Sequence, residues 1–78
     1  MQELELIRYI ATALVEDPAS VEVKEIDQDE ARTIELRVAP DDLGKVIGKQ
    51  GRTARAMRSL LAAATAGSGK DIRLEIVE

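Results

Sequence analysis

The chain has 78 residues and a formal net charge of −4, with no cysteine, histidine, tryptophan or phenylalanine. This length favours one domain over residues 1–78 with a small core. The missing side chains are the usual general base, thiolate nucleophile and transition-metal ligands, so we expect neither an enzyme nor a metal or cofactor site. No apolar run is long enough to span a membrane, and Glu3 and Glu5 stand where a signal peptide would be positive, so we expect a cytoplasmic protein.

An amphipathic helix and two strands are predicted first. Apolar residues recur at three- and four-residue steps over residues 4–15, as one face of a helix requires, and Asp17-Pro18 ends this helix. Apolar and polar residues then alternate in residues 21–23 and 34–38, with the polar break DQDEA between them. This alternation predicts two antiparallel strands with one buried face, the second closed by Pro40.

Two helices separated by a glycine turn follow. Asp41 or Asp42 would cap a short helix over DLGKVI by accepting free backbone N–H groups, and a catalytic or metal role is the alternative for this acidic pair. After the turn GKQG, Arg52 begins a longer helix that ends at Gly67-Ser68-Gly69. Its predicted buried face comprises Ala54, Met57, Leu60, Leu61 and Ala64.

Residues 72–77 alternate again and predict a third strand, so the element order is α-β-β-α-α-β. A strand, a helix pair and a strand form a crossover unit, so the last strand should lie parallel to residues 33–39 with a right-handed connection. The predicted fold class is α+β, a three-stranded mixed sheet with three helices on one face.

The charges divide sharply along the chain. Residues 1–42 contain four basic and twelve acidic residues, whereas residues 43–70 contain six basic residues and no acidic residue. A phosphate-binding surface needs such a region without acids, and a simple turn does not. The six basic residues are Lys45, Lys49, Arg52, Arg55, Arg58 and Lys70.

The GKQG turn has two interpretations. It can be only a helix–helix turn, in which Gly48 and Gly51 allow a sharp reversal. It can also be an anion site, because the first N–H groups of the following helix lack partners and lie at the positive end of the helix dipole. The cations that can surround this place are Lys45, Lys49, Arg52 and Arg55.

Two nucleotide-binding motifs do not fit this turn. A Walker A loop needs one residue more before its Gly-Lys pair and then Ser or Thr, whereas GKVIGKQ continues with glutamine. A dinucleotide fingerprint follows a strand and precedes one long helix, whereas these glycines lie between two helices. Tyr9 is the single aromatic residue, which disfavours proteins that bind bases by aromatic stacking.

The run DLGKVIGKQGRTARAMRSLLAAA, followed by LEIVE, resembles the KH domain, in which a GXXG loop clamps about four single-stranded nucleotides. The order α-β-β-α-α-β resembles the type II form of that domain. With its length, the chain is similar over nearly all its residues to the small bacterial stand-alone KH proteins of the KhpA (YlqC) family.

This resemblance implies a set of RNA contacts. The RNA backbone would approach Gly48 and Gly51, and Arg52 and Arg55 would extend the phosphate contact beyond Lys49. An apolar floor of Leu43, Val46 and Ile47 would lie under the bases, with the sheet edge at residues 34–38 as the opposite wall. Burial in the core is the alternative for Val46 and Ile47, and a solvated helix face is the alternative for Arg55 and Arg58. The expected RNA-binding residues are Lys45, Val46, Ile47, Gly48, Lys49, Gln50, Gly51, Arg52 and Arg55.

The resemblance also implies a function. It is that of a non-enzymatic single-stranded RNA-binding protein, an RNA chaperone or post-transcriptional regulator, that forms a homodimer or a heterodimer with a larger KH-containing RNA-binding protein. The alternative is a protein-interaction or dimerisation module with a KH shape and incidental RNA contact, for which the alanine-rich residues 61–66 offer a surface.

Overall fold

A three-stranded mixed sheet forms one layer of the molecule. The computed structural model describes residues 2–27, 31–66 and 71–77. Strands β1 (Glu22–Asp27), β2 (Ala31–Arg37) and β3 (Asp71–Val77) lie in the order β1-β2-β3. β1 pairs with β2 antiparallel, and β3 pairs with β2 in parallel with Leu74 opposite Ile34. The predicted antiparallel pair and parallel crossover are therefore confirmed.

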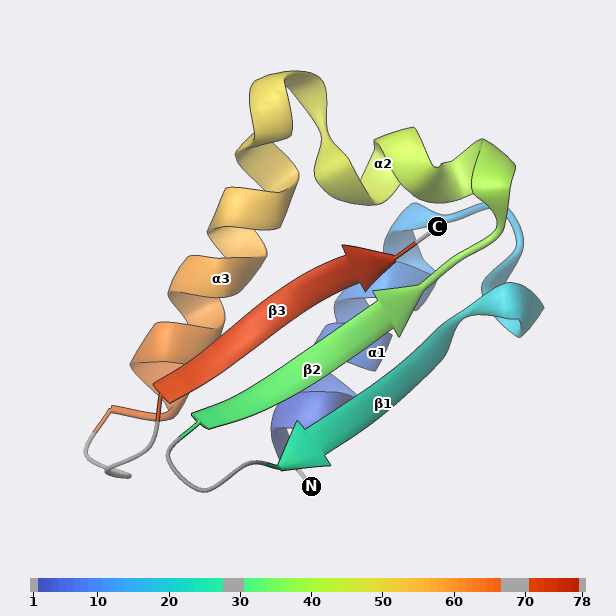
Figure 1. The fold of residues 1–78 in the computed structure, drawn as a ribbon. Helices are drawn as coiled ribbons and strands as arrows, with labels where there is room; N and C mark the ends of the chain where they lie inside the picture. The colour runs from blue at the N-terminus through green and yellow to red at the C-terminus, as the bar shows by residue number, and fades with distance from the viewer. Residues whose placement is uncertain (1, 28–30, 67–70, 78) are drawn as a thin grey trace.

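Three helices form the second layer, on one side of the sheet (Figure 1). α1 (Gln2–Leu14) and α3 (Arg52–Ala64) pack along the strands, and α2 (Leu43–Ile47) lies near the end of the sheet to which β2 and β3 point. Short 3-10 turns lie between α1 and β1 (Pro18–Ser20), between β2 and α2 (Pro40–Asp42) and between α2 and α3 (Lys49–Gly51). The predicted α+β order and layering are confirmed. Within the ranges just given, none of the helices has the length and apolar character that crossing a membrane requires.

The core lies between the two layers and fixes α3 against the sheet. Alternate strand residues point into it, as the period of two requires. Met57 and Leu61 are each 1% exposed, and they hold α3 to the rest of the core. The start of α3, where the GKQG turn lies, is therefore attached to a rigid element. The buried apolar cluster comprises Ile7, Ala11, Ile34, Leu36, Val38, Val46, Met57, Leu61 and Leu74.

Several predicted details differ. α1 ends at Leu14, before the predicted stop at Asp17-Pro18. Leu60 is 48% exposed and Ala64 is also exposed, so the predicted buried face of α3 is too wide. Leu60 lies about 100° around the helix from Leu61, which continues the buried row instead. The predicted break at residues 28–30 and the stop at Gly67-Ser68-Gly69 lie outside the described residues.

Candidate functional site

The GKQG turn reverses the chain between α2 and α3 (Figure 1). Gly48, Gln50 and Gly51 have φ values of 78°, 58° and 75°, all in the region that favours glycine. The Gly48 N–H donates to the Gly44 carbonyl at 2.9 Å, and the Gly51 N–H donates to the Gly48 carbonyl at 3.1 Å. These bonds end α2 and begin α3 within a single turn.

The two glycines are required for different reasons. A Cβ at Gly48 would lie 2.9 Å from the backbone nitrogen of Thr53 and even closer to the Thr53 side chain. A Cβ at Gly51 would meet open space, so only its positive φ disfavours a side chain there. Gly48 therefore permits a close approach between the turn and α3.

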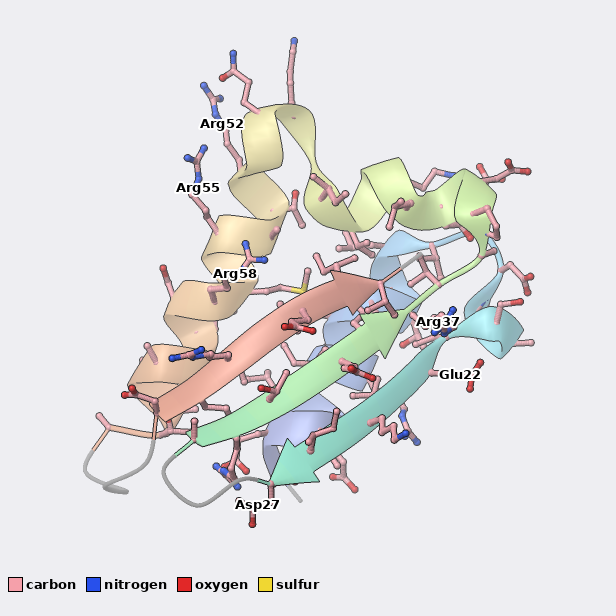
Figure 2. The ribbon with its side chains drawn as sticks, in the orientation of Figure 1. Glu22, Asp27, Arg37, Arg52, Arg55 and Arg58 are labelled. Atoms are coloured by element: carbon pink, nitrogen blue, oxygen red, sulfur yellow. The ribbon has the colours of Figure 1, made fainter. Side chains whose placement is uncertain are left out.

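Two arginines hold the strained residue of the turn. Gln50 is the non-glycine residue with a positive φ among those that the structure describes, a conformation that costs on the order of 1 kcal/mol. Arg55 Nη2 donates to the Gln50 carbonyl at 2.8 Å, and Arg52 Nη2 donates to Gln50 Oε1 at 3.2 Å. Figure 2 shows both arginines on the outer side of α3, close to the turn. Their positive charges are thus held at the turn, in which the side chain of Lys49 is also exposed.

A groove of about 310 Å³ opens directly from the turn and runs between α3 and β3. Ile47, Ala54 and Ile76 give it apolar surface, and Arg55 and Arg58 give it positive charge. Cations stand at the turn and aliphatic side chains beside it, so the site offers electrostatic contact and apolar contact to one extended ligand. Its lining consists of Ile47, Gln50, Gly51, Ala54, Arg55, Arg58 and Ile76.

The predicted floor and wall of this groove need correction. Ile47 lines the groove, whereas Val46 is 0% exposed and belongs to the core. Leu43 is half-buried and packs against that core. The predicted wall at residues 34–38 is wrong, because β2 is the central strand and has no free edge. Ile76 of the edge strand β3 stands there instead.

Lys45 points toward an acidic pair and does not line the groove. Its Nζ lies 3.0 Å from Glu16 Oε1 and 3.3 Å from Asp42 Oδ1. Of the four cations predicted to surround the turn, the structure therefore places Lys49, Arg52 and Arg55 at the turn. Lys45 instead forms an ion pair with Glu16, which lies in the segment that follows α1.

Asp42 does not cap α2 as predicted. Its side chain makes no capping hydrogen bond, because its backbone is already helical, whereas a capping residue is extended. Asp42 Oδ1 accepts the Glu16 N–H at 3.2 Å, and Oδ2 accepts the Asp17 N–H at 3.1 Å. The residue is 3% exposed. Asp42 therefore ties the segment after α1 to the start of α2 and so positions the helix that leads into the turn.

We expect Asp42→Asn to lower the melting temperature at pH 7 by about 5 °C or more, because a charged acceptor of two backbone N–H groups is lost. Burial raises the pKa of Asp42, but the hydrogen bonds from Glu16, Asp17 and Lys45 outweigh it and hold the pKa below 3.8. A lowered folded-state pKa stabilises the fold above the unfolded-state pKa, and this stabilisation is lost as the pH falls through the folded-state pKa.

Thermal melting of both proteins between about pH 7 and pH 2 checks this expectation. The difference in melting temperature should shrink below about pH 4. The exposed neighbour supplies the control, since Asp41→Asn should change the melting temperature little at any pH. A difference between wild type and Asp42→Asn that stays constant down to the lowest pH would contradict the role given to Asp42.

Three groove residues, Ala54, Arg58 and Ile76, are missing from the predicted site. Ala54 was instead assigned to the buried face of α3, and it is 4% exposed. A signal for Arg58 was present, because Arg52, Arg55 and Arg58 recur every three residues and so lie in one row along α3. Ile76 had no local signal, since its place beside the groove depends on β3 being the edge strand next to α3.

Comparison with other sequences identifies relatives along nearly the whole chain. The model of the family "KhpA/KhpB, KH domain" matches residues 4–76. A relative named RNA-binding protein KhpA, from Caldanaerobacter subterraneus subsp. tengcongensis, is 52% identical and the match covers 94% of this chain and 97% of that protein. Another of the same name, from Halalkalibacterium halodurans, is 51% identical with coverage of 94% and 96%.

Solved structures share the fold. The chain superposes on Aquifex aeolicus Era bound to GDP and AlF4- with a TM-score of 0.68 and 21% identity, covering 96% of this chain and 29% of Era. A second Era structure, in complex with MgGDPNP and nucleotides 1506–1542 of 16S ribosomal RNA, gives a TM-score of 0.63 and 19% identity, covering 96% and 30%. This chain thus corresponds to less than a third of Era. From the match over residues 4–76 and from relatives half identical to it, the chain belongs to the KhpA/KhpB KH-domain family.

Proposed function

We propose that this chain binds single-stranded RNA, with phosphates at the GKQG turn and bases over the groove between α3 and β3. The observation that carries the proposal is that the turn and the groove form one continuous surface, because Gln50 and Gly51 belong both to the turn and to the groove lining. Phosphate contacts position a strand and contacts to the bases select it, so the two surfaces must adjoin. Relatives about half identical to this chain are named RNA-binding protein KhpA, which supports the proposal.

The proposed contacts divide by chemistry. Lys49, Arg52 and Arg55 contact phosphates, and the turn at Gly48 and Gly51 lets the RNA backbone come close. The bases lie over the apolar part of the lining and over the side chain of Gln50. Lys45 and Val46 are left out of this set, because one is paired with acids and the other is buried. The groove residues proposed to contact the bases are Ile47, Gln50, Ala54 and Ile76.

A single groove of this size holds few nucleotides, so affinity and sequence preference are modest for one copy. Pairing with a second RNA-binding module raises the effective concentration and hence the affinity. We therefore propose a non-enzymatic, cytoplasmic RNA chaperone or post-transcriptional regulator that folds as one domain. It works as a homodimer or as a heterodimer with a larger KH-containing RNA-binding protein.

The affinity for single-stranded RNA is expected to fall with salt at a slope of about −2 in log units. Each neutralised phosphate of a single strand contributes about −0.7, and roughly three cations are involved. Titration of a labelled unstructured oligonucleotide at several salt concentrations measures the slope. A slope near zero would contradict phosphate contact, and tighter binding to a duplex of equal length would contradict a groove for unpaired bases.

A protein-interaction module is a second candidate, favoured by one observation. Leu60 is 48% exposed on α3, and Ala56, Ala63 and Ala64 are exposed at neighbouring positions of the same helix. This apolar surface lies away from the groove lining, so a protein contact there is compatible with bound RNA. The mass of the purified chain in solution tests this candidate. A chain that stays monomeric at high concentration and binds no second protein would contradict it.

A further inference from the structure

A second cavity continues the groove along α3 and β3. It has a volume of about 340 Å³ and includes the buried side chains of Leu61 and Leu74 with the half-buried Ile72. Arg58 lines both this cavity and the groove at the turn. Figure 2 shows Arg58 on α3, nearer to β3 than Arg52 and Arg55 are. A strand that enters at the turn and follows α3 therefore reaches Arg58 and then the second cavity.

The guanidinium of Arg58 is held by a weak contact that a ligand can replace. Its Nε and Nη2 both donate to the Leu74 carbonyl, each at 3.4 Å. These distances exceed the usual range of about 2.7–3.2 Å for N–H···O bonds. Leu74 belongs to the edge strand, so its carbonyl faces α3 rather than a neighbouring strand. A base that displaces this contact therefore meets the two N–H donors of Arg58 next to the freed Leu74 carbonyl, in a cavity that the exposed side chains of Arg73 and Glu75 also line.

We propose that Arg58 selects the base over the second cavity and favours guanine and cytosine over adenine and uracil; this inference rests on the proposed binding of single-stranded RNA. Guanine presents N7 and O6 as acceptors followed by the N1–H donor. Cytosine presents O2 and N3 followed by the N4–H donor. Both match the two donors of Arg58 and the Leu74 carbonyl in order.

Adenine and uracil do not match this arrangement. Adenine presents N7, the N6–H donor and N1, and uracil presents O4, the N3–H donor and O2, so a donor lies between two acceptors in each. One N–H of the Arg58 fork would then face another donor and lose its partner in a partly buried site. The half-buried apolar side chain of Ile72 contacts the base plane without distinguishing one base from another.

The test measures the affinity for uracil oligomers of about eight nucleotides in which one position at a time carries guanine, cytosine or adenine. Wild type should bind the best guanine or cytosine oligomer about fivefold or more tightly than the matching adenine or all-uracil oligomer. Arg58→Lys keeps the charge but loses the fork, so the preference should fall below about twofold. Arg58→Gln offers one donor and one acceptor, so the preference should shift toward adenine.

The matched control is Arg8→Lys, the same substitution at an exposed position of α1, which should keep both the affinity and the preference of wild type. Melting temperatures verify that each variant is folded. Equal wild-type affinity for all four bases, or a preference that persists in Arg58→Lys, would overturn the role of Arg58 while RNA binding stands. Failure of wild type to bind any oligomer would overturn RNA binding itself and the inference with it.

Discussion

Replacement of Lys49 and Gln50 together by aspartate is expected to weaken single-stranded RNA binding at least tenfold and to leave the fold intact. The change removes one cation and places two carboxylates in the turn, where they repel phosphate and pair with Arg52 and Arg55. Both side chains are exposed, so the free energy of unfolding should change by less than about 1 kcal/mol. Aspartate also tolerates the positive φ of Gln50 at least as well as glutamine does.

The measurement compares RNA affinity, thermal melting and solution mass for wild type and the double variant. A control with the same charge change carries Lys24→Asp and Ala13→Asp, two exposed positions on β1 and α1. If net charge alone governs binding, both variants lose affinity equally, and the assignment of the turn fails. Unchanged affinity in the folded Lys49→Asp/Gln50→Asp variant would also refute that assignment, and loss of an oligomer would favour the protein-interaction candidate.

Gly48→Ala is expected to destabilise the fold by about 2 kcal/mol or more, and Gly51→Ala by about 1 kcal/mol. Both residues have positive φ values, so both substitutions introduce backbone strain. The added methyl group at residue 48 also collides with the Thr53 backbone nitrogen and side chain, and α3 must shift to accept it. The methyl group at residue 51 meets open space.

Urea unfolding of the two variants measures the two losses of unfolding free energy. The test is whether Gly48→Ala costs more than Gly51→Ala, rather than either value by itself. Equal costs would show that only the backbone conformation requires glycine at residue 48. Since the shift of α3 also moves Arg52 and Arg55 relative to the turn, Gly48→Ala should weaken RNA binding more than Gly51→Ala does.

The secondary structure and topology were predictable because the signals are local or follow from connectivity. The alternation at Ile34 and Leu36 and again at Ile72 and Leu74 marks strands that expose one face. The parallel pairing of β2 and β3 follows from the helix pair between them, since a crossover of that length joins parallel strands. The glycine turn was equally predictable, because the spacing of its glycines between two helices is a local feature of the sequence.

The errors in the candidate site concern contacts between residues that are distant in the sequence. An aspartate before a helix has the same local pattern whether it caps that helix or, like Asp42, accepts N–H groups of Glu16 and Asp17. Lys45 was counted with the other cations because the sequence gives no direction for its side chain, and its acidic partner Glu16 lies in another segment. The wall of the groove was assigned to β2 because strand order, which makes β3 the edge, is not a property of either strand alone.

The separation of charge also determines how the molecule responds electrically to a polyanion. Arg52, Arg55 and Arg58 lie on α3, and Glu22 and Asp27 lie on β1 at the opposite edge of the sheet (Figure 2). The molecule measures 35 × 23 × 18 Å, whereas the Debye length at physiological ionic strength is about 8 Å. A strand at the turn therefore experiences the nearby cations and little of the net charge of −4. In dilute buffer the screening length approaches about 30 Å, so the whole dipole acts at once. It orients the turn toward the RNA, while the acidic residues of β1 repel the same RNA molecule.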